Sequence, residues 1–140
     1  MAKDFQKVID ICKKQLSDES IKVKPYFSLA WYSYRLGDYK QSIESGEKGI
    51  ALNPDIPVAH FNLGLAYLDA EDDDKAVKAY EAGIKIVKSS SSFEINKVFE
   101  DAKTYIKDLI LTKPDRRKTA DNIIALLENS RKKFLDSIKG

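Results

Sequence analysis

Residues 23–56 (VKPYFSLAWYSYRLGDYKQSIESGEKGIALNPDI) and residues 57–90 (PVAHFNLGLAYLDAEDDDKAVKAYEAGIKIVKSS) are two copies of one segment of 34 residues. Shifting the sequence by 34 positions superposes identical residues of the two copies, namely Phe27 on Phe61, Leu29 on Leu63, Asp38 on Asp72, Glu47 on Glu81, Gly49 on Gly83 and Ile50 on Ile84. Regular repeats of roughly 20 to 50 residues are typical of chains whose units cannot bury their apolar faces alone and therefore stack. The duplication predicts a repeat fold.

The second copy predicts a pair of helices. Apolar residues recur three and four positions apart in its first half, at Ala59, Leu63, Ala66, Tyr67, Leu68 and Ala70. Pro57 stands where a first-turn proline is tolerated. The acidic residues 71–74 interrupt this pattern and open a second helix, where carboxylates face the positive end of the helix dipole. The buried face of the second helix is predicted to contain Ala76, Val77, Tyr80, Gly83, Ile84 and Val87.

The first copy follows the same plan. Gly37 and Asp38 are predicted to form the turn between its helices, and Asn53-Pro54 ends the second helix. Small residues recur where the two helices of each copy should cross, in the pairs Ala30/Gly64, Ser42/Ala76 and Gly49/Gly83. A glycine inside a helix costs about 1 kcal/mol relative to alanine. We therefore expect close packing of a neighbouring backbone at these positions to compensate for that cost.

Both copies carry elements of one family motif: a large residue, Leu-Gly, Tyr, Ala, an aromatic residue, Ala and Pro. The matching residues here are Leu63-Gly64, Tyr67, Ala76, Tyr80 and Pro54. The departures are His60 and Tyr26 where Trp is usual, Ser33 where Tyr is usual, Gly46 where an aromatic residue is usual, and Lys88 where Pro is usual. The chain resembles the tetratricopeptide repeat family. The resemblance implies an all-α superhelix, a solenoid of antiparallel helix pairs with repeats at residues 23–56 and 57–90.

Residues 1–22 are similar to the second half of a repeat. The same shift places Phe5 on Tyr39 and Ile9 on Ile43, so this segment predicts a short amphipathic helix without a preceding partner. Two interpretations follow. The chain is a fragment of a longer repeat protein, which we favour, or the half-repeat is a natural N-terminal cap.

Residues 91–140 predict a divergent third helix pair that either stacks as a repeat or caps the solenoid. Ser91 and Glu94 have the spacing of a capping box at the start of a long helix. Pro114 ends that helix, and Asp115 is predicted to begin the last one. The basic residues beside this proline (Lys113, Arg116, Arg117 and Lys118) and the acidic residues 69–74 are interpreted as solvated helix ends.

Composition restricts the classes of function. The length of 140 residues predicts one domain. The net charge of +2 gives no electrostatic reason to expect binding of nucleic acid. Cys12 and His60 are the only cysteine and histidine, so a disulfide within the chain, a histidine-based metal site and a catalytic triad are not expected. We predict no cofactor, no catalytic activity and no membrane span. If Met1 is the natural start, the absence of an apolar signal region favours the cytoplasm.

The resemblance places a candidate peptide site on the concave face, which the first helix of each pair lines. The predicted groove residues are Phe27, Trp31, Tyr34, Arg35, Phe61, Asn62, Leu65, Leu68 and Asp69, flanked by Lys24 and Val58. A carboxylate clamp, the best-known binding chemistry of the family, is not expected, because only Asn62 suits it. Phe27 and Trp31 replace the expected polar residues.

The aromatic and aliphatic character of this groove predicts a non-catalytic protein-interaction module that binds an apolar peptide or helix. Two alternatives remain open. The C-terminal helices of the same chain fill the groove. Or the protein self-assembles through its terminal helices, giving a homo-oligomer.

Overall fold

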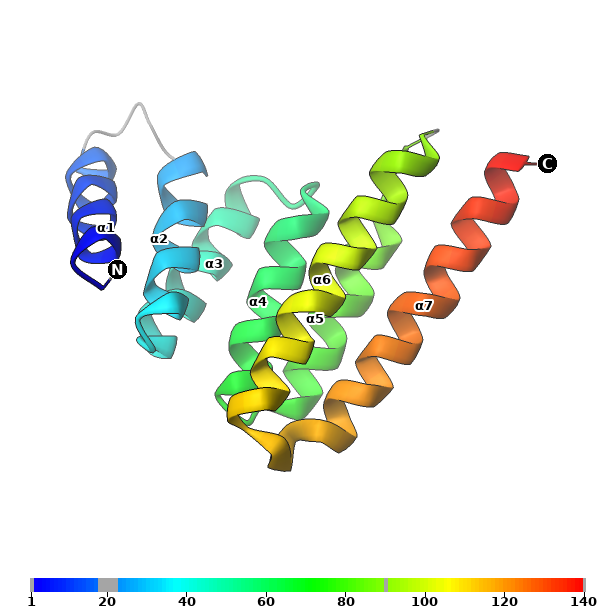
Figure 1. Cartoon of the computed structure of the whole chain (residues 1–140). Coiled ribbons are helices and arrows are strands. Elements are labelled where there is room, and N and C mark those ends of the chain that lie inside the picture. The colour runs from blue at the N-terminus through cyan, green and yellow to red at the C-terminus, as the bar shows by residue number, and fades with distance from the viewer. Residues whose placement is uncertain (1, 18–22, 90, 140) are drawn as a thin grey trace.

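The computed structural model describes residues 2–17, 23–89 and 91–139. This part of the chain forms seven α-helices and one short 3-10 helix: α1 (Ala2–Leu16), α2 (Val23–Arg35), α3 (Tyr39–Leu52), α4 (Pro57–Asp69), α5 (Asp73–Lys85), α6 (Ser92–Thr112), η1 (Pro114–Arg116) and α7 (Arg117–Lys139). The helix pairs follow one another from α1 at one end to α7 at the other, with α3 behind α2 and α5 behind α6 in this view (Figure 1). The predicted all-α solenoid of helix pairs is confirmed.

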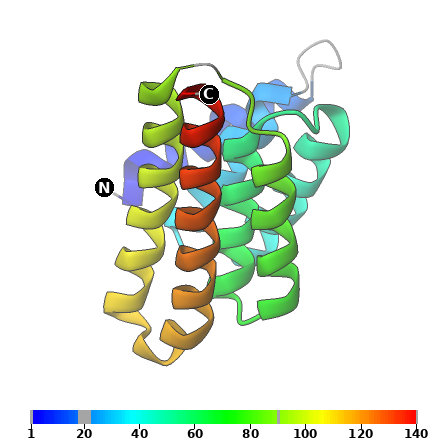
Figure 2. The same ribbon diagram turned by 90° about the vertical axis from the view of Figure 1, so that its right-hand side faces the viewer.

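Consecutive helices form three packed pairs, α2 with α3, α4 with α5 and α6 with α7. The pairs stack because α3 also packs against α4, and α1 packs against α2 as the second helix of a missing pair would. The third pair is arranged differently. Its first helix, α6, packs on α4, and α7 packs on both α6 and α5 (Figure 2).

Aspartate caps begin the second helix of both repeats. The carboxylate of Asp38 accepts a hydrogen bond from the backbone N–H of Gln41 at 3.1 Å, and Asp72 accepts one from Lys75 at 3.3 Å. Each cap satisfies a backbone donor that the first turn of a helix leaves unpaired. These bonds give a physical reason for the recurrence of the two aspartates 34 residues apart.

The recurring glycines lie under aromatic rings, whereas the small-residue pattern predicts a neighbouring backbone at these positions. A methyl group on Gly49 would lie 2.5 Å from the ring of Phe27, and one on Gly83 would lie 2.6 Å from the ring of Phe61. Such separations are far below van der Waals contact. Each ring therefore packs directly on the backbone of its partner helix, which fixes the spacing within each pair.

The start of α6 differs in detail from the predicted capping box. The hydroxyl of Ser91 accepts the N–H of Glu94 at 3.3 Å, as expected. In a capping box the Glu94 carboxylate would accept the backbone N–H of Ser91. Here the hydroxyl of Ser89 lies between them: it accepts the N–H of Ser91 at 3.0 Å and donates to the Glu94 carboxylate at 2.6 Å. Because Ser89 is interposed, Glu94 reaches the cap indirectly.

The largest apolar core joins the second repeat to the third pair. Its largest fully buried members are Leu65, Leu68, Tyr80, Ile95, Phe99, Ile106, Ile123 and Leu127. A smaller core joins α1 to α2 through Ile9, Cys12 and Leu29. The last helix begins at Arg117 rather than at Asp115, because residues 114–116 form the 3-10 turn. Polar side chains cover the exposed face of α7, including Lys118, Asp121, Asn122, Asn129, Lys132 and Lys133.

Candidate peptide-binding groove

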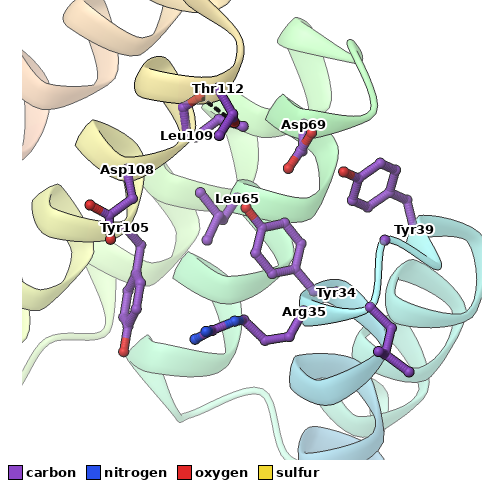
Figure 3. Close-up of a pocket in the computed structure, with 11 residues that line it drawn as sticks. Tyr34, Arg35, Tyr39, Leu65, Asp69, Tyr105, Asp108, Leu109 and Thr112 are labelled. Carbon is purple, nitrogen blue, oxygen red and sulfur yellow. Dashed lines mark hydrogen bonds between the residues drawn. The ribbon is translucent and has the colours of Figure 1, made fainter. Parts of the chain in front are cut away.

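A cavity of about 470 Å³ opens between α2, α4 and α6, and we call it the main cavity. Figure 3 shows its lining residues in close-up. The lining residues are Tyr34, Arg35, Leu36, Gly37, Tyr39, Leu65, Asp69, Tyr105, Asp108, Leu109 and Thr112. The first repeat supplies one wall, the second repeat supplies the floor and the third helix pair supplies the other wall. The sequence analysis left this contribution open, as the alternative in which the C-terminal helices fill the groove.

A second cavity of about 210 Å³ lies along the same groove. Its lining residues are Trp31, Val58, Phe61, Asn62, Val98, Asp101, Ala102 and Tyr105. Tyr105 lines both cavities, and its ring meets that of Trp31 edge-on, with centroids 4.8 Å apart. This contact joins α6 to α2 across the groove and lies between two spaces that could each receive a side chain.

The predicted groove residues fall into two groups. Phe61, Leu65 and Leu68 of the second repeat are 4%, 2% and 0% exposed, so they belong to the core. Phe61 stacks on Tyr80 and also meets Phe99 of α6. The alternative in which the C-terminal helices cover the groove therefore describes this half of it.

The first repeat keeps its groove residues accessible. Phe27, Trp31 and Tyr34 are half-buried and Arg35 is exposed, while Asn62 of the second repeat is also half-buried. These residues line the two cavities, except for Phe27, whose ring packs on Gly49. Their contact with a ligand stays a prediction, and the accessible surface on which it depends belongs mainly to α2 and α6.

A buried carboxylate organises the floor of the main cavity. Asp69 is 7% exposed, and the ammonium group of Lys113 lies 2.5 Å from its carboxylate and donates to its backbone carbonyl at 3.0 Å. The hydroxyls of Tyr34 and Tyr39 point toward the same carboxylate (Figure 3). Three helices and the residue after α6 therefore meet at one buried charge.

The electrostatics of this cluster follow from its burial. Desolvation, and then the neighbouring Asp69 carboxylate, raise the pKa of Tyr34, because both disfavour a second negative charge. The same causes raise the pKa of Tyr39. The hydrogen bond to Asp69 raises the pKa of Lys113, because it stabilises the protonated amine. The tyrosines therefore remain neutral donors and Lys113 remains charged at neutral pH.

The turn after α6 docks onto the C-terminal end of α4. The guanidinium group of Arg116 donates to the backbone carbonyl of Leu68 at 3.1 Å and forms an ion pair with Asp73. The hydroxyl of Thr119 donates to Asp73 at 2.8 Å. Cations are favourable at this end of a helix, where backbone carbonyls lack partners.

This docking corrects two predictions about solvated helix ends. Asp69 is buried against Lys113, and Asp73, which stays partly exposed, forms an ion pair with Arg116. Both predictions fail at these residues, because the paired charges lie 44 and 43 positions apart in sequence and meet only in space, which local charge runs do not reveal. Arg117 and Lys118 are exposed, as expected.

Phe5 of α1 adds a contact that the sequence did not signal. The guanidinium carbon of Arg35 lies 5.3 Å from the centre of the Phe5 ring and 5.7 Å from that of Trp31. Both separations are within the range of cation–π attraction. The half-repeat therefore helps to orient a groove residue.

The described residues contain neither a metal centre nor a membrane-spanning helix. No group of three or more histidine, cysteine, aspartate or glutamate side chains among them could hold a metal ion. None of the described helices combines the length and apolar character that a membrane crossing needs.

Comparison with known proteins identifies the repeats. A model of the TPR repeat matches residues 33–71, and a model of the tetratricopeptide repeat matches residues 57–90. Among curated proteins, no sequence matches the chain. Among solved structures, the crystal structure of MamA is similar, with a TM-score of 0.60 and 21% sequence identity over 91% of this chain and 69% of that chain. That likeness concerns the fold. Residues 33–90 belong to the tetratricopeptide repeat family.

Proposed function

We propose that the protein is a non-catalytic interaction module that binds an apolar peptide or helix of a partner protein between α2 and α6. The observation that carries this proposal is the pair of cavities on either side of the Trp31–Tyr105 contact. Tetratricopeptide repeats in general serve as protein-binding scaffolds without catalysis. The repeats at residues 33–90 support the same role here.

The groove offers anchors of the kind that dominate protein interfaces. Tyr105 is 37% exposed and Val58 is 48% exposed, and both line cavities beside the half-buried Trp31. Aromatic side chains bury a large apolar area at low entropic cost and are enriched in binding hot spots. A partner that places one apolar side chain in each cavity would bury all three residues.

The binding mode is tested with peptides selected against the whole chain. A phage library of random peptides is panned on the protein, and a selected peptide free of tryptophan is then titrated while the emission of Trp31, the only tryptophan, is followed. We expect Tyr105→Ala to weaken binding at least about tenfold, the ratio that corresponds to about 1.4 kcal/mol. The ring removed is an anchor in both cavities.

Phe93→Ala is the matched control on the same helix. Phe93 is 75% exposed and lines neither cavity, so its loss should leave the affinity unchanged. Equal losses in the two variants would contradict the groove as the site. A peptide that binds without changing Trp31 emission would contradict it too, as would a selection that yields no binding peptide. Circular dichroism spectra of both variants show whether the helical fold is retained.

A further inference from the structure

Arg35 is an exposed, oriented cation at the rim of the main cavity. The rings of Phe5 and Trp31 hold its guanidinium group at 5.3 Å and 5.7 Å, which restricts the side chain without using its hydrogen-bond donors on a carboxylate. Figure 3 shows the side chain extending from α2 toward Tyr105 on the opposite wall. A ligand that reaches this position finds the donors already in place, which lowers the entropic cost of binding.

The charge of the main cavity leaves Arg35 available. Within residues 2–17, 23–89 and 91–139, no ion pair links Arg35 to an acidic side chain. Lys113 neutralises the floor carboxylate, Asp69, at 2.5 Å. The remaining carboxylate of the lining is Asp108, which is exposed on α6. The cavity therefore combines one available cation on the α2 wall with one anion on the α6 wall.

This arrangement favours one kind of ligand charge. The planar guanidinium group matches a carboxylate in a bidentate geometry. A phosphate group carries close to two negative charges, and Asp108 would repel the second of them. The rings of Tyr34 and Tyr105 line the cavity beside Arg35, so they favour a ligand with an apolar side chain next to its negative charge.

We propose that Arg35 selects partner segments that carry a single aspartate or glutamate side chain next to a large apolar residue. This inference rests on the proposed function of the groove and specifies the class of its partner. The apolar residue enters the main cavity against Tyr34 and Tyr105, and the carboxylate pairs with Arg35. Asp108 lowers the affinity for segments with several acidic residues in a row.

The test uses end-blocked peptides of defined sequence in a Gly/Ser background. Each contains one Phe and one Glu, adjacent or separated by one to three residues, and each has matched versions with Gln, Lys or phosphoserine in place of Glu. Binding to the whole chain is measured by Trp31 emission. We expect the best Glu peptide to bind about fivefold more tightly than its Gln match, the ratio for a partly exposed ion pair of about 1 kcal/mol.

Three variants assign the preference to its residues. Arg35→Gln should abolish the preference for Glu, measured as the ratio of the affinities for the Glu and Gln peptides. Arg35→Lys should retain part of this preference, because the charge remains but the planar fork is lost. Asp108→Asn should raise the same ratio about twofold by removing the opposing charge.

The outcomes separate this inference from the proposed function. Saturable binding of Phe peptides without preference for Glu, or with preference for Lys or phosphoserine, overturns the role of Arg35 and leaves the groove function standing. A Glu preference that persists in Arg35→Gln also overturns it. If none of the Phe peptides binds, both proposals fail. A Glu preference that Arg35→Gln removes supports both.

Discussion

At the scale of single residues, the two repeats form the same turn with different residue types. Gly37 and Glu71 occupy equivalent positions, 34 residues apart, and both have a left-handed backbone, with φ of 83° and 65°. Glycine adopts this conformation without steric cost, whereas other L-residues lose about 1–2 kcal/mol. The second repeat therefore contains local strain that the first repeat avoids.

Exchanging the residue type at these equivalent positions should change stability in opposite directions. Glu71→Gly should raise the free energy of unfolding by about 0.5–1 kcal/mol, since the relief of strain exceeds the added entropy of the unfolded chain. Gly37→Ala should lower it by about 1 kcal/mol, and no other atom lies within 4 Å of the added methyl group to contribute. Urea unfolding followed by circular dichroism measures both, and a destabilised Glu71→Gly variant would refute the strain argument.

At the scale of elements, the segment after α6 determines how the third pair meets the repeats. Lys113 and Arg116 bind the C-terminal end of α4 and the acidic residues that follow it. Lys113 also lies 5.1 Å above the ring centre of Tyr39 on α3. These contacts hold α6 over the floor of the groove and thereby set the width of the main cavity.

Removing Lys113 should destabilise this junction. Lys113→Met leaves the Asp69 carboxylate buried without its cation, and we expect a loss of about 2 kcal/mol or more in the free energy of unfolding. Lys107→Met on α6 is the control, because Lys107 is exposed and has no ion pair within the described residues. Chemical denaturation measures both variants.

A double-variant cycle shows whether Lys113 acts through Asp69. Asp69→Asn combined with Lys113→Met should cost clearly less than the sum of the single variants, because the pair is removed together. Additive losses would mean that the two side chains do not interact.

Glu128 on α7 should make the stability of the contact between α6 and α7 depend on pH in the acidic range. Hydrogen bonds from Lys103 and then from Arg131 lower the pKa of Glu128 from 4.5 to about 2. A carboxyl group with a lowered pKa in the folded state contributes its stability above pH 4.5, and this contribution is lost as the pH falls toward 2. Solvent screening limits the contribution to about 1 kcal/mol.

The prediction is a smaller acid-induced loss of stability in Glu128→Gln than in the unmodified protein. Urea unfolding between pH 6 and pH 2.5 measures it as the difference between the two proteins. Glu94→Gln is the control, because Glu94 is an exposed carboxylate on α6 that contacts Ser89 and no cation. Parallel pH profiles for the unmodified protein and Glu128→Gln would disprove the assignment.

At the scale of the whole molecule, the two outer helices face solvent with polar surfaces. The exposed face of α7 is mostly polar, with Ala125 and the terminal Ile138 as its exposed apolar residues, and α1 exposes one large apolar residue, Ile11, among charged side chains. Faces that stack in a solenoid are apolar, as in the contact of α3 with α4. Self-assembly by stacking of these outer faces is therefore disfavoured.

We accordingly expect the chain to be a monomer in solution. Light scattering coupled to gel filtration should give a mass near 15.9 kDa that does not change with protein concentration. A mass that rises with concentration would favour the self-assembly alternative. In that case Ile11→Ser, which changes the large exposed apolar side chain on α1, identifies the interface by restoring the monomer.

The sequence by itself determined the helix pairs. The caps of Asp38 and Asp72, and the glycines that lie under Phe27 and Phe61, depend on neighbours within the same pair, and a 34-residue duplication displays them twice. Residues that satisfy such short-range constraints therefore recur with the period of the repeat. The confirmed helical solenoid follows from them.

The tertiary structure alone decided which half of the groove stays accessible. An apolar stripe such as Phe61, Leu65 and Leu68 looks the same in sequence whether it faces a partner or another helix of its own chain. Here α6 covers it, and the meeting of Asp69 with Lys113 holds α6 in place. These contacts join residues far apart in the chain, and no local periodicity specifies them. They depend on how long helices with apolar faces fit together in three dimensions.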